Sequence, residues 1–247
     1  NMDTLLTLAN NNSQEVIPPF ALANSLANPQ TRFNVARRYS KNIEKNISSN
    51  KKIFNHINKK NRLNTKLRIG YISPDLRDHS LGQSFQAIIK SHNKDKYDIH
   101  GFSTRITNDK LSNVIKSYFG NFHNISYKSA IEAAKTIYEQ KIDVLIDLAG
   151  HTKNNSLEIL AFRPAPVQAH YLGYGSTIGS DNIDWLITDN VHTPIELYKF
   201  CSESLILLPN SFMSAEYLKI KNINVSRKNE NLPQKSIVFA NFNSTSK

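Results

Sequence analysis

Short apolar runs alternate with stretches of helical spacing along most of the chain, from residue 66 to residue 242. The strongest run, residues 142–147, is apolar at nearly every position, as a strand covered on both faces requires. Helical spacing of apolar residues marks 85–89, 109–118 and 129–140. Strands that alternate with helices predict a parallel, doubly wound α/β sheet. The further predicted strands are residues 67–73, 97–103, 167–172, 183–188, 205–208 and 237–242.

The first part of the chain has a different pattern. Residues 1–66 carry no strong strand signal, and residues 31–47 are predicted to form a helix with a basic outer face. Residues 48–65 are rich in Asn, Lys and Ser and have little periodicity, which is typical of a linker or a frayed helix end. We therefore predict a helical linker over residues 1–65 and a lobe over residues 66–247.

The positive charge is concentrated in one segment. The chain has a formal net charge of +11, and residues 37–68 contain eleven Lys or Arg against one acid, Glu44. Such a stripe is either the solvated face of a helix and linker or a nucleic-acid contact. Aromatic side chains that would stack on bases are sparse there, with Tyr39 and Phe54. We favour the solvated face.

Composition narrows the setting of the protein. The single cysteine, Cys201, excludes an internal disulfide and a multi-cysteine metal site, and it suits a reducing compartment. The sequence contains neither an apolar run of about 18 residues nor a signal peptide. We therefore expect a cytoplasmic location. Both ends of the sequence look like cuts, so we expect it to be a fragment.

The loop after the first predicted strand, residues 73–83, combines groups of different chemistry. Asp75, Arg77 and His79 lie within five positions, before a predicted helix. His79 is the usual type of proton-transfer residue near neutral pH, and Asp75 is placed to orient its ring. The free backbone N–H groups of a helix start suit an anion or a sugar oxygen. The alternative is a polar turn in which His79 is an ordinary surface residue.

Three later stretches also follow or precede strands. In residues 147–155, Gly150 lets a ligand approach the backbone closely, and His151 with Thr152 supplies polar contacts or a helix cap. Residues 172–180 form a glycine-rich loop that lacks the spacing of dinucleotide and P-loop motifs. Residues 162–168 read as scaffold, with Arg163 available to pair with a buried acid.

Several of these stretches, in this order, resemble the catalytic region of protein O-GlcNAc transferases and the related SPINDLY proteins. More loosely, Pro-Phe-Ala-Leu at 19–22 resembles the bacterial linker that precedes this region. The matching stretches are Leu-Arg-Ile-Gly-Tyr-Ile-Ser-Pro-Asp with Asp-His (67–79), Asp-Leu-Ala-Gly-His-Thr (147–152), Arg-Pro-Ala-Pro-Val-Gln with Tyr-Leu-Gly-Tyr (163–174) and Asn-Phe-Asn (241–243). The stretch 163–174 is the most specific of these matches.

The resemblance implies a GT-B glycosyltransferase built from two Rossmann-like lobes. This chain would be the first lobe, preceded by a short helical segment that follows tetratricopeptide repeats. The second lobe, which carries most of the nucleotide contacts, is expected beyond residue 247. The implied reaction is an inverting transfer of GlcNAc from UDP-GlcNAc to Ser or Thr hydroxyls of proteins. The implied partners are the sugar nucleotide and acceptor proteins, with no metal, other cofactor, membrane or nucleic acid.

The resemblance also assigns roles to residues. His79 matches a histidine proposed as base or sugar-contacting group, and Asp75 matches its nearby acid, another proposed base. A phosphate oxygen of the donor is a further candidate for the base. Leu172 and Gly173 match residues that line the sugar pocket, and Leu81 falls beside the position of the acetamide. The predicted donor-binding residues are Leu81, Gly150, His151, Thr152, Leu172, Gly173 and Tyr174.

Other functions remain open at this point. The stretch 150–155 also resembles SPINDLY-type protein O-fucosyltransferases, which use GDP-fucose. A chain that ended at residue 247 would favour a non-catalytic binding module. Nucleic-acid binding through residues 37–68 is the last alternative.

Overall fold

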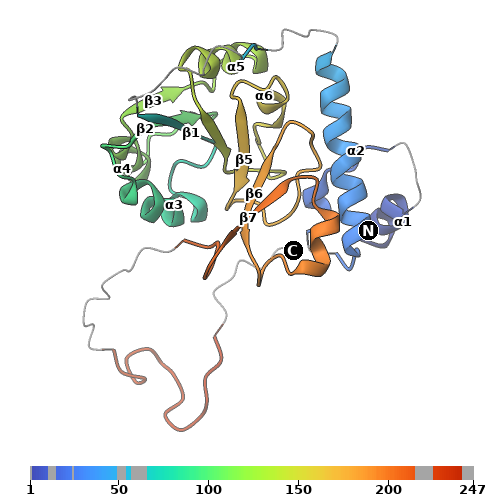
Figure 1. The fold of residues 1–247 in the computed structure, drawn as a ribbon. Helices are drawn as coiled ribbons and strands as arrows, with labels where there is room; N and C mark the ends of the chain where they lie inside the picture. Colours follow the sequence, from blue (N-terminus) through green and yellow to red (C-terminus); the bar gives the residue numbers. More distant parts are fainter. Residues whose placement is uncertain are drawn as a thin grey trace. The chain divides into compact units, whose positions relative to one another are not determined.

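The computed structural model describes residues 2–10, 15–23, 25–48, 54–56, 66–214 and 225–240. Its centre is a seven-stranded sheet in the order β3-β2-β1-β4-β5-β6-β7, in which every neighbouring pair is parallel (Figure 1). This arrangement confirms the predicted doubly wound α/β sheet. The strands are β1 (Leu67–Ser73), β2 (Tyr97–Ser103), β3 (Asn121–Asn124), β4 (Val144–Asp147), β5 (Val167–Tyr171), β6 (Trp185–Asp189) and β7 (Ser204–Leu208).

Helices surround the sheet. The helices predicted near 31–47, 85–89, 109–118 and 129–140 are confirmed as α2 (Pro29–Ser48), α3 (Ser80–Ser91), α4 (Lys110–Tyr118) and α5 (Ala130–Glu139). Asp109 caps α4 by accepting from the Ser112 N–H, and Ser129 with Glu132 forms a capping box on α5. The elements that the sequence pattern did not predict are α1 (Met2–Asn10), η1 (Pro19–Leu22), β3, α6 (Leu157–Ala161) and η3 (Ile195–Phe200).

The sheet separates two apolar cores. Adjacent residues of one strand point to opposite faces, so Tyr71 packs with α3 and α4 while Ile72 packs with α5 and α6. Both faces of β4 are covered in the same way, with Leu145 in one core and Ile146 in the other. This double covering explains why β4 is apolar at nearly every position.

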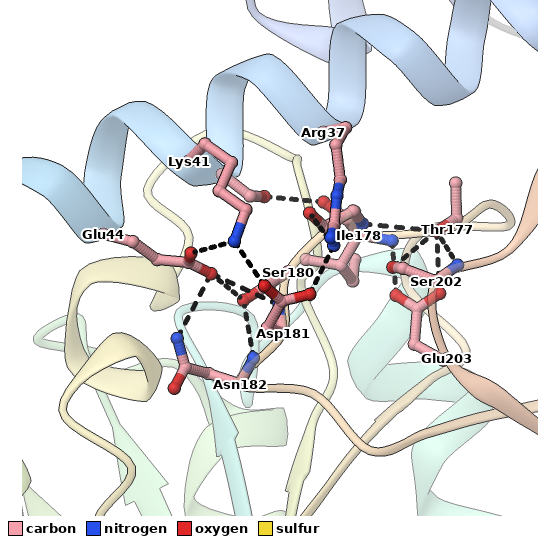
Figure 2. A network of polar contacts seen from close by, with 12 residues as sticks. Arg37, Lys41, Glu44, Thr177, Ile178, Ser180, Asp181, Asn182, Ser202 and Glu203 are labelled. Atoms are coloured by element: carbon pink, nitrogen blue, oxygen red, sulfur yellow. Dashed lines mark hydrogen bonds and ion pairs between the residues drawn. The ribbon is translucent and has the colours of Figure 1, made fainter.

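The helix α2 is bound to the loop that precedes β6. The side chains of Arg37, Lys41 and Glu44 point toward residues 180–182 (Figure 2). Arg37 and Lys41 both pair with the carboxylate of Asp181, and Glu44 accepts from Ser180 Oγ at 2.8 Å. Below them Glu203 accepts from Thr177 Oγ1 and from the Ile178 N–H, at 2.7 and 2.6 Å. Part of the basic segment therefore faces the protein itself.

Arg163 has a partner in the scaffold. Its guanidinium donates to Asp184 Oδ1 at 2.7 Å and to the Pro166 carbonyl at 3.1 Å. Asp184 in turn accepts from the Gln168 N–H at 2.8 Å, which ties the entry of β5 to the entry of β6. The acid that the sequence left unidentified is thus Asp184, which is half-buried rather than buried.

The prediction of a strand over residues 237–242 was wrong for residues 237–240, the part that the structure describes. Residues 237–240 form no strand, and Ile237 and Phe239 are 83% and 92% exposed. A strand needs a neighbour to pair with its backbone and to cover its side chains, and these described residues have none. Residues 241 and 242 lie outside the described residues, as does the Asn-Phe-Asn motif.

The chain divides into two compact units, residues 1–216 and 217–247. In the second, the described part contains a turn closed by a hydrogen bond from the Leu232 N–H to the Arg227 carbonyl. The predicted boundary between a linker and a lobe after residue 65 stays a prediction, because most of 49–65 lies outside the described residues. Among the residues that are described, no helix has the length and apolarity to cross a membrane.

Candidate functional site

The order of the strands reverses between β1 and β4. From β1 the chain continues outward to β2 and β3, and from β4 it continues to the opposite edge. In open parallel sheets, ligands bind beyond the carboxyl ends of the strands at such a point. A cavity of about 480 Å³ is lined by residues from the loops that follow β1, β2, β4 and β5 and from the start of α3, with Phe20 and Met213 completing the lining.

Six of the nine predicted site residues line this cavity, so three predicted loops come together. They are Asp75, His79, Leu81, Thr152, Leu172 and Gly173. The other three, Gly150, His151 and Tyr174, are not in the lining. The functional roles of all nine stay predictions.

The carboxylate of Asp75 is held by the neighbouring cation Arg77. Its Oδ1 accepts from Arg77 Nε at 3.2 Å and lies 3.0 Å from Nη2. Its Oδ2 is 4.0 Å from His79 Nδ1, beyond hydrogen-bond distance. The Arg77 guanidinium therefore holds the Asp75 carboxylate in position through Oδ1. The geometry shows no hydrogen bond between Asp75 and His79, so both predicted roles of Asp75, orienting group and base, stay predictions.

His79 caps the helix α3. Its backbone is extended, and its Nδ1 accepts from the Leu81 N–H at 3.2 Å. A neutral imidazole whose Nδ1 accepts carries its proton on Nε2. With its side chain 41% exposed in the cavity lining, His79 thus offers an N–H donor there in its neutral form. The capping residue is thus also a cavity residue, and its role in proton transfer stays a prediction.

The turn after β5 packs directly on the turn after β4. A Cβ built on Gly173 would lie 1.9 Å from the Leu148 carbonyl oxygen, so only glycine permits this approach. The preceding residue, Leu172, has a φ of +72°, a left-handed conformation that a leucine rarely adopts. Leu148, Leu172 and Gly173 all line the cavity, so its wall is made by two backbones in contact.

A buried ion pair lies behind this wall. The side chains of Asp147 and His170 are both fully buried, and Oδ2 of the first is 3.0 Å from Nδ1 of the second. The same oxygen accepts from the Gly150 N–H at 2.7 Å. On the far side of the ring, Nε2 lies 2.6 Å from the Tyr174 carbonyl. The sequence carried no signal for this pair, because a single His inside an apolar strand does not indicate its partner.

His151 is buried beneath the turn rather than directed into the cavity. Its Nε2 lies 2.8 Å from the Ile178 carbonyl, and its ring meets those of Tyr39 and Tyr174 edge-on at 5.4 and 5.3 Å. Its Nδ1 has no hydrogen-bond partner among the described residues. Burial lowers the pKa of His151 to about 4, so the ring is neutral near pH 7.

Two cations in the lining were missed from the sequence. Arg105 follows β2, and Lys153 follows the predicted stretch at 150–152. Arg105 could have been found from the sequence, because it lies beyond the carboxyl end of β2, where ligands of parallel sheets bind. Within the described residues, no group of three or more His, Cys, Asp or Glu is placed to hold a metal ion. The expectation of a reaction without cofactors stays an expectation.

Comparisons with known proteins identify a family and several relatives of this chain. The profile of glycosyl transferase family 41 matches residues 7–224. The chain is 33% identical over 186 residues to the probable UDP-N-acetylglucosamine–peptide N-acetylglucosaminyltransferase SEC of Arabidopsis thaliana, covering 72% of this chain and 19% of that protein. It is 34% identical over 151 residues to SPINDLY of Solanum lycopersicum, covering 60% of this chain and 16% of that protein. The name of that relative gives the same probable activity.

A solved structure has the same fold. A mutant O-GlcNAc transferase of Thermobaculum terrenum superposes with a TM-score of 0.69 at 24% identity, covering 79% of this chain and 37% of that one. The matched part of the chain spans 19% and 16% of the two curated relatives named above.

Proposed function

Since the chain belongs to glycosyl transferase family 41, we propose that it supplies the first lobe of an inverting glycosyltransferase. The proposed reaction moves GlcNAc from UDP-GlcNAc to Ser and Thr hydroxyls of proteins. The observation that carries this proposal is the cavity at the β1–β4 reversal, which joins Asp75, His79 and the Leu172–Gly173 turn. Because the chain covers a small share of its relatives, the activity is proposed for the full-length protein. We propose a cytoplasmic location for it, to be checked by cell fractionation.

The cavity offers groups for the tasks of such a transfer. The reaction needs an acceptor hydroxyl held behind the anomeric carbon, and it needs stabilisation of the departing diphosphate. His79 brings an N–H donor, while Arg105 and Lys153 bring positive charge to the lining. The Leu172–Gly173 turn gives one side of the cavity a fixed shape. We assign the sugar end of the donor to this cavity.

A second candidate comes from the SPINDLY relatives. Their identity to this chain is close to that of the SEC relative, over a shorter match. The resemblance of residues 150–155 to SPINDLY-type O-fucosyltransferases makes a protein O-fucosyltransferase that uses GDP-fucose the alternative to be tested beside the first. Both candidates require the same cavity and a second lobe, and they differ in the donor.

The donor test uses the full-length gene product with radiolabelled UDP-GlcNAc and GDP-fucose, each with a cell extract as acceptor. We expect label from UDP-GlcNAc on Ser or Thr of proteins, and no transfer by residues 1–247 alone. Label from GDP-fucose alone would replace the first candidate with the second. No transfer from either donor would contradict a glycosyltransferase.

His79 can be tested without disturbing the helix that it caps. Asparagine is a good N-cap residue, so His79→Asn keeps the cap of α3 and removes the imidazole. We expect kcat/KM to fall about 100-fold, since single groups in proton transfer or charge stabilisation contribute on this order. Thermal denaturation should show an unchanged midpoint for His79→Asn and a lower one for His79→Ala. Unchanged turnover in His79→Asn would remove His79 from the mechanism.

A further inference from the structure

Asp147 and His170 are polar residues in the most apolar part of the molecule. Both are fully buried, one at the end of β4 and the other opposite it in β5. Burying a carboxylate and an imidazole is unfavourable unless their hydrogen bonds are made inside the protein. Here every described partner belongs to the two turns behind the cavity: the N–H groups of Ala149 and Gly150, and the carbonyl of Tyr174.

The partners of His170 define its charge. Nδ1 faces a carboxylate oxygen at 3.0 Å and Nε2 faces a carbonyl oxygen at 2.6 Å, and both oxygens are acceptors. Only an imidazolium donates from both nitrogens, whereas a neutral ring would set a lone pair against one of the oxygens. Burial opposes the charge, but the hydrogen bond and negative charge of Asp147 outweigh it and raise the pKa of His170. The two acceptor distances and the raised pKa of His170 therefore favour an imidazolium that donates to both oxygens.

The two hydrogen bonds of His170 connect the two turns that form the cavity wall. The bond to Tyr174 closes a short loop that contains Leu172 and Gly173, and the bond to Asp147 fixes this loop to the turn after β4. Leu172 is held with a φ of +72°, which surrounding contacts must maintain. Neither Asp147 nor His170 lines the cavity. Their effect on a ligand must act through the wall.

We propose that Asp147 and His170 form a charged clamp that holds the Leu172–Gly173 turn in the shape that receives the sugar of the donor. Both are positioning residues, and neither touches the substrate. The proposal rests on the proposed sugar transfer for its functional meaning. The structural part of the proposal, a charged pair that holds two turns together, can be measured separately from sugar transfer.

The activity arm compares His170→Gln and Asp147→Asn in the full-length protein. Glutamine keeps a donor for the Tyr174 carbonyl but carries no charge, and asparagine keeps the shape of Asp147. We expect kcat to fall roughly ten- to 100-fold in each, because small misplacements of a wall shift the reacting atoms. The KM for the donor should change less than threefold. The double variant should be no worse than the single ones, since each substitution already opens the clamp.

The matched control is His123→Gln, which replaces a half-buried histidine on the edge strand β3, away from the cavity lining. It should keep the kcat of the unsubstituted protein. Variants of the pair that fold with unchanged kcat would overturn the clamp. A loss confined to KM would overturn it too, because it would indicate weaker binding rather than misplacement.

A second experiment tests the structure of the two turns and does not depend on measurable sugar transfer. Hydrogen exchange followed by mass spectrometry should be at least tenfold faster in His170→Gln over residues 148–153 and 171–176, with α5 unchanged. Equal exchange in these two segments would overturn the clamp even if transfer were lost. If the unsubstituted protein transfers no sugar while these segments loosen, the proposed function fails and the clamp stands.

A measurement on the unsubstituted protein covers the case in which the variants do not fold. With ¹⁵N placed only in histidine rings, magnetic resonance at pH 7 should show one ring with both N–H protons protected from water. A free imidazole at this pH is mostly neutral. Finding only neutral rings among the protected histidines would overturn the charged pair.

Discussion

Replacing Gly173 with alanine is expected to reduce the proposed sugar transfer about 100-fold and to destabilise the fold by about 3 kcal/mol. The added methyl carbon would lie 1.9 Å from the Leu148 carbonyl oxygen, and 3.0 Å from its carbon. The obstacle is backbone, which cannot rotate away as a side chain does. The turns after β4 and β5 must separate, and the cavity wall separates with them.

Gly120→Ala provides the control for this substitution. A Cβ at Gly120 would meet its nearest atoms at 3.6 Å, an ordinary contact, and its backbone has no left-handed φ. We expect this variant to keep its activity and its midpoint in urea denaturation. Full activity in a folded Gly173→Ala protein would contradict the contact between the two turns.

Acid should destabilise this protein through His151. Burial lowers the pKa of His151 to about 4 from its ordinary value of 6.5. Between these values the unfolded chain binds a proton that the folded chain does not, so stability falls as the pH falls. The loss reaches about 3 kcal/mol by pH 4. His170 acts in another range: its raised pKa gives stability that is complete below 6.5 and is lost as the pH rises through the folded value.

The measurement is urea unfolding at intervals from pH 7 to pH 4, for the unsubstituted protein and for His151→Gln. Glutamine keeps a donor for the Ile178 carbonyl but does not titrate. Carboxylate effects are common to both proteins and cancel in the difference. The gap between the two should narrow by about 3 kcal/mol as the pH falls. A constant gap would mean that His151 is not buried in its neutral form.

The sheet could be predicted because its central strands are covered on both faces. In β4 this covering makes residues 144–146 apolar, and the run is visible without any structure. The short strand β3 has the sequence Asn-Phe-His-Asn and forms because β2 presents a free edge to it. Residues 237–240 show the reverse, since Val and Phe favour strands but find no neighbour. Pairing decides both cases, and pairing is not local.

The site was predictable to the extent that it follows from strand ends. Asp75 and Thr152 were found because each follows a strand, and the carboxyl ends of parallel strands meet at one edge. Leu172 was predicted from the family resemblance instead. Asp147 and His170 could not be paired from the sequence, since only the register of β4 against β5 sets them opposite each other. His151 shows the limit of motif matching, because its position identifies it as polar but not as buried.

The attachment of α2 to residues 180–182 determines where chimeric proteins can be joined. A hybrid whose α2 lacks Arg37, Lys41 and Glu44 would leave Asp181 without its two cations and Ser180 without its carboxylate partner. The same loop continues back to the turn at Leu172 and Gly173. A junction before Pro29 therefore keeps this helix and this loop together in one parent sequence.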